Sequence, residues 1–285
     1  MKKTDAFAKN SFSERMKSML RVDFRRMFKS RTFYILIACA LLVPIVMTVM
    51  LTMMDGQETV NQQTGEVTVM EGPDSVWQSI GTPPKKSDEV FDTDSGEAEG
   101  GMAAMGGMDV MAMCNINMAF MAVAVFVCLF ISDDFRSGYA KNIFTVRAEK
   151  TEYVVSKTVS GFICGTAMLI AYFIGAMLAG GITSLSFEMQ GFGAGNVLMC
   201  MISKIMLMLV FVPIFVLISV SAKQRAWASI CGSLGGGMLL FMMVDMITPL
   251  TSTPLNVLLT AAGGAMFAFG LGAASKLVLK KTSLV

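Results

Sequence analysis

Residues 197–222 read VLMCMISKIMLMLVFVPIFVLISVSA, an apolar run with one charged side chain, Lys204. A helix needs roughly 20 residues to cross a hydrocarbon layer about 30 Å thick, so this run is long enough to do so. Inside lipid every backbone amide must be hydrogen-bonded within its own segment, which favours a helix over irregular chain. The run therefore predicts a transmembrane helix.

Other apolar runs of similar length lie on both sides of it. The six runs are Phe33–Met54, Met111–Ser132, Thr158–Gly180, Val197–Ala222, Ala226–Thr248 and Leu255–Ser275. Composition agrees with a membrane protein, since 54% of the residues are hydrophobic and 15% are charged. The sequence predicts an all-α membrane protein with a six-helix transmembrane domain. The expected boundaries are a basic region at 1–32, the transmembrane domain at 33–275 and a tail at 276–285.

Basic side chains concentrate in alternate connecting segments. All but three of the 23 Lys and Arg residues lie in residues 1–32, 133–157, 223–225 and 276–285. The three exceptions are Lys85, Lys86 and Lys204. Basic loops stay on the cytoplasmic side of a membrane. Both termini and residues 133–157 are therefore predicted to be cytoplasmic, and residues 55–110 external.

The basic region is expected to form an amphipathic helix over residues 11–31. Its apolar residues recur at spacings of three and four, with Arg and Lys between them: Phe12, Met16, Met19, Leu20, Phe24, Met27 and Phe28. Ser11 and Glu14 have the spacing of a capping box at the helix start. Such a helix lies in the membrane interface, with its basic residues toward anionic lipid. The alternative is a plain cluster of charge beside the first membrane span.

The external segment, residues 55–110, holds twelve acidic residues and few aromatic ones. This composition buries too little apolar area to offset the entropy of ordering. We expect a largely irregular loop that is ordered only where it packs on helix ends. Residues Glu66–Met70 alternate like a short strand after a turn at Thr64 and Gly65, so a small hairpin is the alternative.

Lys204 and Asp245 are charged residues within the apolar runs, and both are expected near the external face. A charge at the centre of a membrane costs about 2.5–3.5 kcal/mol on insertion scales. The two residues form a candidate outer polar pair, and the alternative is that each side chain extends separately to the interface. No series of buried acids and bases crosses the bilayer, which argues against transport driven by an ion gradient.

Motifs for catalysis are missing from the sequence. It has no histidine and no HExxH, GxSxG or EF-hand pattern, and GLGAASK at residues 270–276 lacks the Gly-Lys-Ser/Thr ending of a phosphate loop. The six cysteines lack metal-ligand spacing. We therefore expect no enzymatic activity, no cofactor or metal in this chain, and no nucleic-acid partner.

One alternative concerns copper. Met102, Met105, Met108 and Met111 recur every three residues, and thioethers are soft ligands that suit Cu(I). A copper-handling permease that uses residues 102–118 is therefore a second interpretation. The ordinary role of such methionines is flexible packing.

The connection between the second and third runs is the most specific segment. Residues 133–157 read DDFRSGYAKNIFTVRAEKTEYVVSK. An acidic pair ends the second run, Gly138 allows a sharp turn, and a short amphipathic helix follows. A return helix beginning near Thr151 is expected to lead into the third run.

This segment resembles the cytoplasmic loop of ABC-2 type transporter permeases. In that family an acidic residue, a Gly-Thr-like turn, a short helix and a Tyr-x-x-Ser-Lys motif occur in the same loop. Here Tyr139 stands in place of the usual Thr, and Tyr153, Ser156 and Lys157 form the last motif. The resemblance extends to the order of a basic interfacial helix, six spans and a large first external loop.

The resemblance implies that the loop is a coupling helix that docks on a separate ATPase subunit. The residues it assigns to coupling are Asp133, Asp134, Arg136, Gly138, Tyr139, Lys141, Ile143 and Phe144. It also implies an exporter in the bacterial plasma membrane that moves an amphiphilic substrate, such as an antimicrobial peptide or drug. Two permease subunits, identical or paralogous, would be paired in the lipid bilayer, with ATP and Mg bound in the partner ATPase. The alternatives are a solvated turn at this loop and, for the chain, a membrane scaffold or assembly protein without transport.

Overall fold

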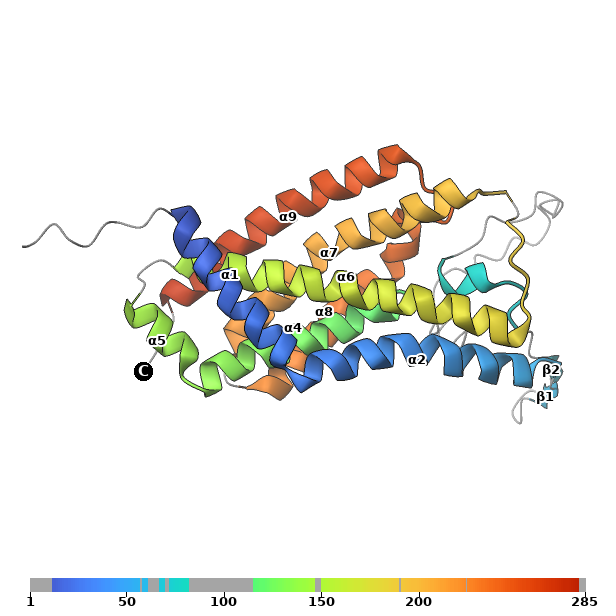
Figure 1. Cartoon of the computed structure of the whole chain (residues 1–285), viewed down its shortest axis with the longest axis horizontal. Helices are drawn as coiled ribbons and strands as arrows, with labels where there is room; N and C mark the ends of the chain where they lie inside the picture. The colour runs from blue at the N-terminus through green and yellow to red at the C-terminus, as the bar shows by residue number, and fades with distance from the viewer. Residues whose placement is uncertain are drawn as a thin grey trace, which may run out of the picture.

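The computed structural model describes residues 12–56, 58–60, 67–69, 72–81, 115–146, 150–189, 191–223 and 225–281. Its elements are α1 Phe12–Lys29, α2 Arg31–Met54, β1 Glu58–Val60, β2 Val67–Val69, the 3-10 helix η1 Val76–Ser79, α4 Met118–Arg136, α5 Tyr139–Val146, α6 Lys150–Thr183, α7 Ala194–Ala222, α8 Ala226–Ile247 and α9 Pro254–Lys281. The long helices form an elongated bundle and run roughly along its axis (Figure 1). The structure agrees with the predicted all-α architecture and contains one short hairpin.

Within the described residues, five helices are long and apolar enough to cross a membrane, namely α2, α4, α6, α7 and α9. The fold is therefore that of a multi-pass helical membrane protein. In α8 the corresponding apolar stretch, Ala226–Phe241, is shorter. The sixth crossing expected from the sequence thus stays a prediction.

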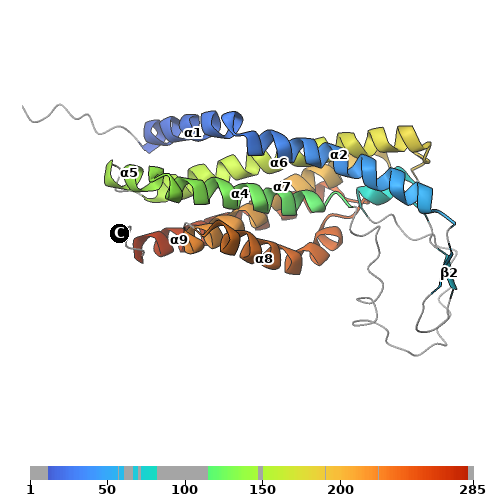
Figure 2. The ribbon, with the colours of Figure 1, turned by 90° about the horizontal axis from the view of Figure 1, so that it is seen from below.

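Helices α4, α6 and α7 form the centre of the bundle. Half or more of the residues in their most apolar stretches are buried within the chain, against 17% in α2 and 11% in α9. Figure 2 shows α1 and α2 along one side of this centre, and α8 and α9 along the opposite side. The outer helices expose large apolar side chains such as Leu239 and Phe269, as lipid-facing helices do.

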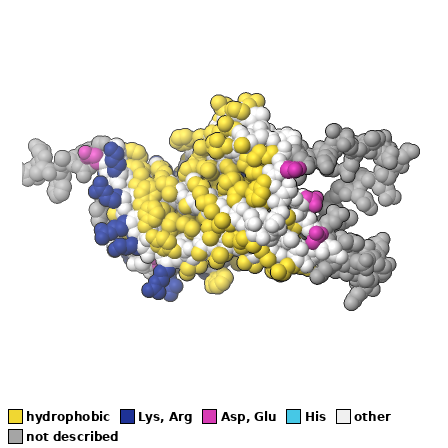
Figure 3. All heavy atoms as spheres, turned by 45° about the vertical axis from the view of Figure 1, so that its right-hand side comes forward, with side chains coloured by type: hydrophobic (Ala, Val, Ile, Leu, Met, Phe, Trp, Pro, Cys, Tyr) yellow, Lys and Arg dark blue, Asp and Glu magenta, His cyan; other side chains and the backbone are white. Residues whose placement is uncertain are grey.

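Charged side chains gather at the two ends of the bundle, with an apolar belt between them (Figure 3). We call the basic end the one at which α5 lies and α6 begins. The opposite end carries the β1–β2 hairpin and η1 (Figure 1). This segregation matches the alternation of charge along the sequence, and it places the surface charges outside the apolar belt.

Three helices that the sequence predicts outside the apolar runs are present: the amphipathic helix, the short helix after Gly138 and the return helix near Thr151. The amphipathic segment is helical as α1, although Ser11 of the predicted capping box lies outside the described residues. The return helix near Thr151 and the third apolar run form one continuous helix of 34 residues, α6. The short helix after Gly138 is α5.

Glycines allow α6 to lie close to its neighbours. A Cβ atom at Gly161 would lie 2.7 Å from Cγ1 of Val212 in α7. A Cβ atom at Gly175 would lie 2.3 Å from the carbonyl oxygen of Leu41 in α2. Contacts this short leave no room for a side chain, so these glycines set the distance between helices.

Part of the expected external segment packs on the helix ends. Val76, Trp77 and Ile80 are buried, and the indole Nε1 of Trp77 donates a hydrogen bond to the carbonyl oxygen of Phe187 at 3.2 Å. This agrees with the expectation that the segment is ordered where it meets the helices.

The hairpin alternative for the external segment is also confirmed. Strands β1 and β2 pair antiparallel, with Glu58 opposite Val69. Residues 82–114 lie outside the described residues, and they include Met102–Met111 of the copper interpretation.

Candidate functional site

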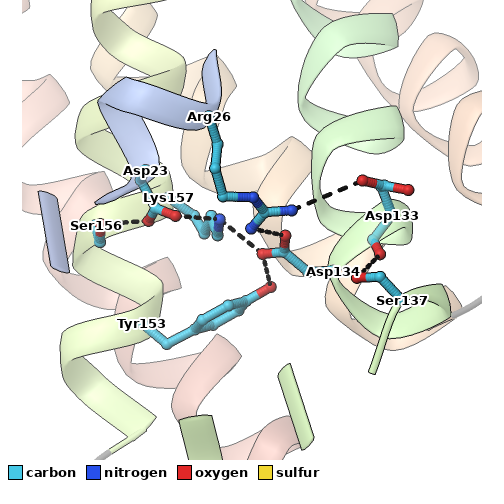
Figure 4. A network of polar contacts seen from close by, with 8 residues as sticks. All are labelled: Asp23, Arg26, Asp133, Asp134, Ser137, Tyr153, Ser156 and Lys157. Atoms are coloured by element: carbon cyan, nitrogen blue, oxygen red, sulfur yellow. Dashed lines mark hydrogen bonds and ion pairs between the residues drawn. The ribbon is translucent and has the colours of Figure 1, made fainter. Parts of the chain in front are cut away.

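A network of buried charges joins three helices near the basic end. Helix α1 contributes Asp23 and Arg26, α4 contributes Asp134, and α6 contributes Tyr153 and Lys157 (Figure 4). Their side chains converge from segments that are far apart in the sequence. The network attaches α1 to α4 and α6.

Lys157 lies between two carboxylates. Its Nζ atom is 2.8 Å from Oδ1 of Asp23 and 2.6 Å from Oδ2 of Asp134. All three side chains have no exposed surface. Removing an ion from water costs several kcal/mol, so these groups are stable here only because each has partners of opposite charge.

Asp134 is the centre of the network. Arg26 donates to its Oδ1 at 2.5 Å, and the hydroxyl of Tyr153 donates to its Oδ2 at 3.0 Å. Asp23 likewise accepts a hydrogen bond from the Ser156 hydroxyl at 2.5 Å. Two carboxylates and two cations therefore balance in charge, and hydroxyl groups occupy further lone pairs.

The position of Asp23 on α1 explains how it reaches the network. The buried residues of this helix are Met19, Asp23 and Met27, which are spaced four apart and lie on one face. Two methionines pack on the bundle, and the carboxylate between them meets Lys157. The sequence signal for this site is an acidic residue on the apolar stripe of a basic helix, and Asp23 was not among the predicted site residues.

Helix α5 is attached to the same network. Gly138 has φ +75°, a conformation that favours glycine, so the predicted sharp turn is confirmed. The ring of Tyr139 lies 4.2 Å from the Arg26 guanidinium carbon, and the ring of Phe144 lies 5.2 Å from that of Tyr153. Both ends of α5 therefore contact residues of the network.

The local electrostatics keep Arg26 charged and Tyr139 neutral. Burial lowers the pKa of Arg26, but the Asp134 carboxylate more than offsets this, so the pKa of Arg26 is raised. Burial raises the pKa of Tyr139, and the negative charge of Asp23 adds to the effect. The raised pKa of Arg26 favours the charged guanidinium that pairs with Asp134.

Gly138 and Tyr139 lie at the turn into α5, and the other six residues predicted for coupling form an inner and an outer group. Asp134 is buried in the network, while Ile143 and Phe144 are half-buried and pack on the core. Asp133 is 69% exposed and lies 3.7 Å from Arg26. Arg136 and Lys141 are exposed on the outer surface. The inner group links α5 to the bundle, and the outer group is presented to the surroundings.

A second polar cluster contains the predicted outer pair. Nζ of Lys204 is 3.0 Å from Oδ1 of Asp245 and 2.8 Å from Oδ1 of Asn117. The amide of Asn115 donates to Oδ2 of Asp245 at 3.1 Å. The pairing is confirmed, and Lys204 is fully buried rather than extended separately to the interface.

Metal ligation has no support in the described part of the chain, where no group of three His, Cys, Asp or Glu residues is placed to hold an ion. No family model, curated protein or solved structure matches the chain. Paired charges and hydroxyls contributed by α1, α4 and α6 form a joint between these helices.

Proposed function

We propose that this chain is the membrane subunit of an ATP-driven exporter of the ABC-2 type. It would cross the bacterial plasma membrane six times, with both termini in the cytoplasm. Two such subunits would pair, and a separate ATPase would bind at the basic end. The substrate class is an amphiphilic molecule such as an antimicrobial peptide or drug.

One observation carries this proposal. The Tyr-x-x-Ser-Lys motif that resembles the permease family consists of Tyr153, Ser156 and Lys157, and all three side chains take part in the buried network. The acidic residue of the same loop, Asp134, is at its centre. The residues of the Tyr-x-x-Ser-Lys motif are thus the ones that connect α6 to α1 and α4.

Helix α5 has the two faces that coupling requires. Its inner face reaches the network through Phe144 and Tyr153, whose rings are 5.2 Å apart. Its outer surface presents Lys141 and Asn142, with Arg136 just before the turn. A partner that displaces α5 would therefore move the side chains that hold α1, α4 and α6 together.

The source of energy in this proposal is external to the chain. The two charged clusters lie near opposite ends of the bundle: Asp23 and Lys157 at the basic end, Lys204 and Asp245 toward the other. A proton relay across a membrane needs ionisable groups along its path. A bound ATPase acting on α5 requires none.

Copurification tests the docking surface. The tagged chain would be purified in mild detergent from its native membrane, and the ATP hydrolysis retained with it measured. We expect retained hydrolysis for the parent chain and a loss of about tenfold or more for the double variant Arg136→Glu and Lys141→Glu, since reversed charges at an interface disfavour its partner. The double variant Lys17→Glu and Lys280→Glu is the matched control, because it reverses the same number of charges at exposed positions outside α5.

Reconstitution tests transport itself. The purified complex would be placed in vesicles, and accumulation of a labelled cationic antimicrobial peptide followed with ATP, without ATP, and with the proton gradient collapsed. ATP-dependent movement that persists without the gradient supports the proposal. Stable ATPase binding without movement of any amphiphile tested favours the scaffold, and gradient-driven movement without an ATPase contradicts the proposal.

A further inference from the structure

A basic pocket lies beside the network, where α1 ends and α2 begins. Its volume is about 570 Å³, within the range of roughly 300–1,000 Å³ that is usual for small-molecule sites. Arg25, Arg26 and Lys29 line one side. The aromatic side chains of Phe126 and Phe130, from α4, line the other.

The residues that the structure describes do not balance the charge of this pocket. Arg26 is committed to Asp134 and Asp133, and Asp133 is the one carboxylate in the pocket lining. Neither Arg25 nor Lys29 forms an ion pair with any residue that the structure describes. The pocket therefore keeps two cationic groups for an external anion.

Two hydroxyl side chains also line the pocket. Ser30 and Thr32 line the pocket, and the Ser30 side chain caps no amide of α2. A phosphate group accepts hydrogen bonds from hydroxyls and from Arg and Lys together. The polar side of the pocket therefore has the donors that a phosphate requires.

The apolar side identifies the source of that phosphate. Besides the wall from α4, the neighbouring residues Phe28, Tyr34 and Ile35 are exposed, at 50%, 57% and 59%. The basic surface adjoins the apolar belt of the bundle (Figure 3). A free inorganic anion would use the cations alone, whereas a membrane lipid has a phosphate next to acyl chains and uses both sides.

We infer that this pocket binds the headgroup of one anionic glycerophospholipid from the adjoining leaflet. Arg25 and Lys29 hold the phosphate with Arg26 at the inner edge, and the glycerol end lies against Phe126 and Phe130. Arg26 belongs both to the pocket and to the buried network, so the bound lipid contacts the joint between α1 and α4. This inference requires only the membrane fold, and it holds whether or not the chain transports anything.

Lipid-binding measurements on the intact chain test the site. The purified protein would be titrated with phosphatidylglycerol and with phosphatidylcholine, and bound lipid counted by native mass spectrometry. The double variant Arg25→Gln and Lys29→Gln removes the free cations and leaves the buried network intact. The control is Lys17→Gln and Arg21→Gln, an equal change in charge at exposed positions of the same helix outside the pocket.

We expect one tightly held phosphatidylglycerol per parent chain and per control chain, with phosphatidylcholine bound more weakly. The pocket variant should lose about 10- to 30-fold in affinity for phosphatidylglycerol, as two basic residues near an anionic membrane surface supply. Equal losses in the pocket variant and the control would mean diffuse surface attraction and overturn the inference. Displacement of the lipid by inorganic phosphate would mean a free-anion site, and would overturn it as well.

Discussion

Nζ of Lys157 lies 2.8 Å from Oδ1 of Asp23, joining α6 to α1 across 134 positions of sequence. Both side chains are completely buried. This ion pair, together with the Asp134 carboxylate that Lys157 also contacts, holds α1 against α4 and α6. The stability of the basic end therefore depends on a few charges whose partners are all internal.

Replacing Lys157 with Met should destabilise the chain strongly. The change leaves the carboxylates of Asp23 and Asp134 close together without the cation between them, which costs about 3–5 kcal/mol for a buried pair. Unfolding of the purified protein in detergent measures the effect. The exposed Lys141→Met is the matched control and should stay within about 0.5 kcal/mol of the parent. In a double-mutant cycle with Asp23→Asn, a loss in the double variant equal to the sum of the two single losses would mean that the two residues are not energetically coupled.

Tyr153→Phe isolates the contribution of one hydroxyl. The phenyl ring keeps its contact with Phe144, while Asp134 loses one of its hydrogen-bond donors. A hydrogen bond to a charged group contributes about 1.5–3 kcal/mol, so a loss in that range is expected. Tyr153→Ala should cost more, about 3–5 kcal/mol, because the ring is lost too. Equal stability of the Phe variant and the parent would mean that the hydroxyl does not support Asp134.

Gly175→Ala should separate α2 from α6. The added Cβ atom would lie 2.3 Å from the carbonyl oxygen of Leu41 and 2.7 Å from the ring of Pro44, so one helix has to move. Overpacking of this kind costs about 1–3 kcal/mol. At Gly181 in the same helix an added Cβ atom would have no neighbour within 4 Å, so Gly181→Ala should be neutral or slightly stabilising. Unfolding midpoints of the two variants distinguish packing from helix propensity, and a similar loss in both would contradict the packing argument.

Replacing Asp245 should destabilise the protein more than replacing Lys204. Lys204 is fully buried, whereas the Asp245 side chain is 29% exposed. Asp245→Ala leaves a buried ammonium with Asn117 as its remaining acceptor, and about 3–5 kcal/mol should be lost. Lys204→Met leaves a carboxylate that reaches solvent and keeps the Asn115 donor, so a smaller loss of about 1–3 kcal/mol is expected. The reverse order of stability would show that Asp245 has the more costly environment.

Hydropathy and turn chemistry predicted much of this fold because both depend on local sequence. Apolar length located the five long membrane helices, and Gly138 marked the turn before α5. The pair of Lys204 and Asp245 could be predicted because a charged side chain within an apolar run has few partners other than another such charge. The role of Asp23 was not visible, because its partner is 134 residues away and only the docking of α1 brings them together. Lys157 was named as part of the Tyr-x-x-Ser-Lys motif, but its ion pair with Asp23 was not predicted.

The unbroken course of α6 has a mechanical consequence. At 1.5 Å per residue its 34 residues extend roughly 51 Å, well beyond a hydrocarbon layer of about 30 Å. Its first two turns carry Tyr153 and Lys157, while Gly175 and Gly180 near its far end press on α2 and on Val76. The helix is thus a single lever. Because α6 is continuous, a tilt of its first turns at the basic end also moves its far end. No relay of side chains is needed between the two ends.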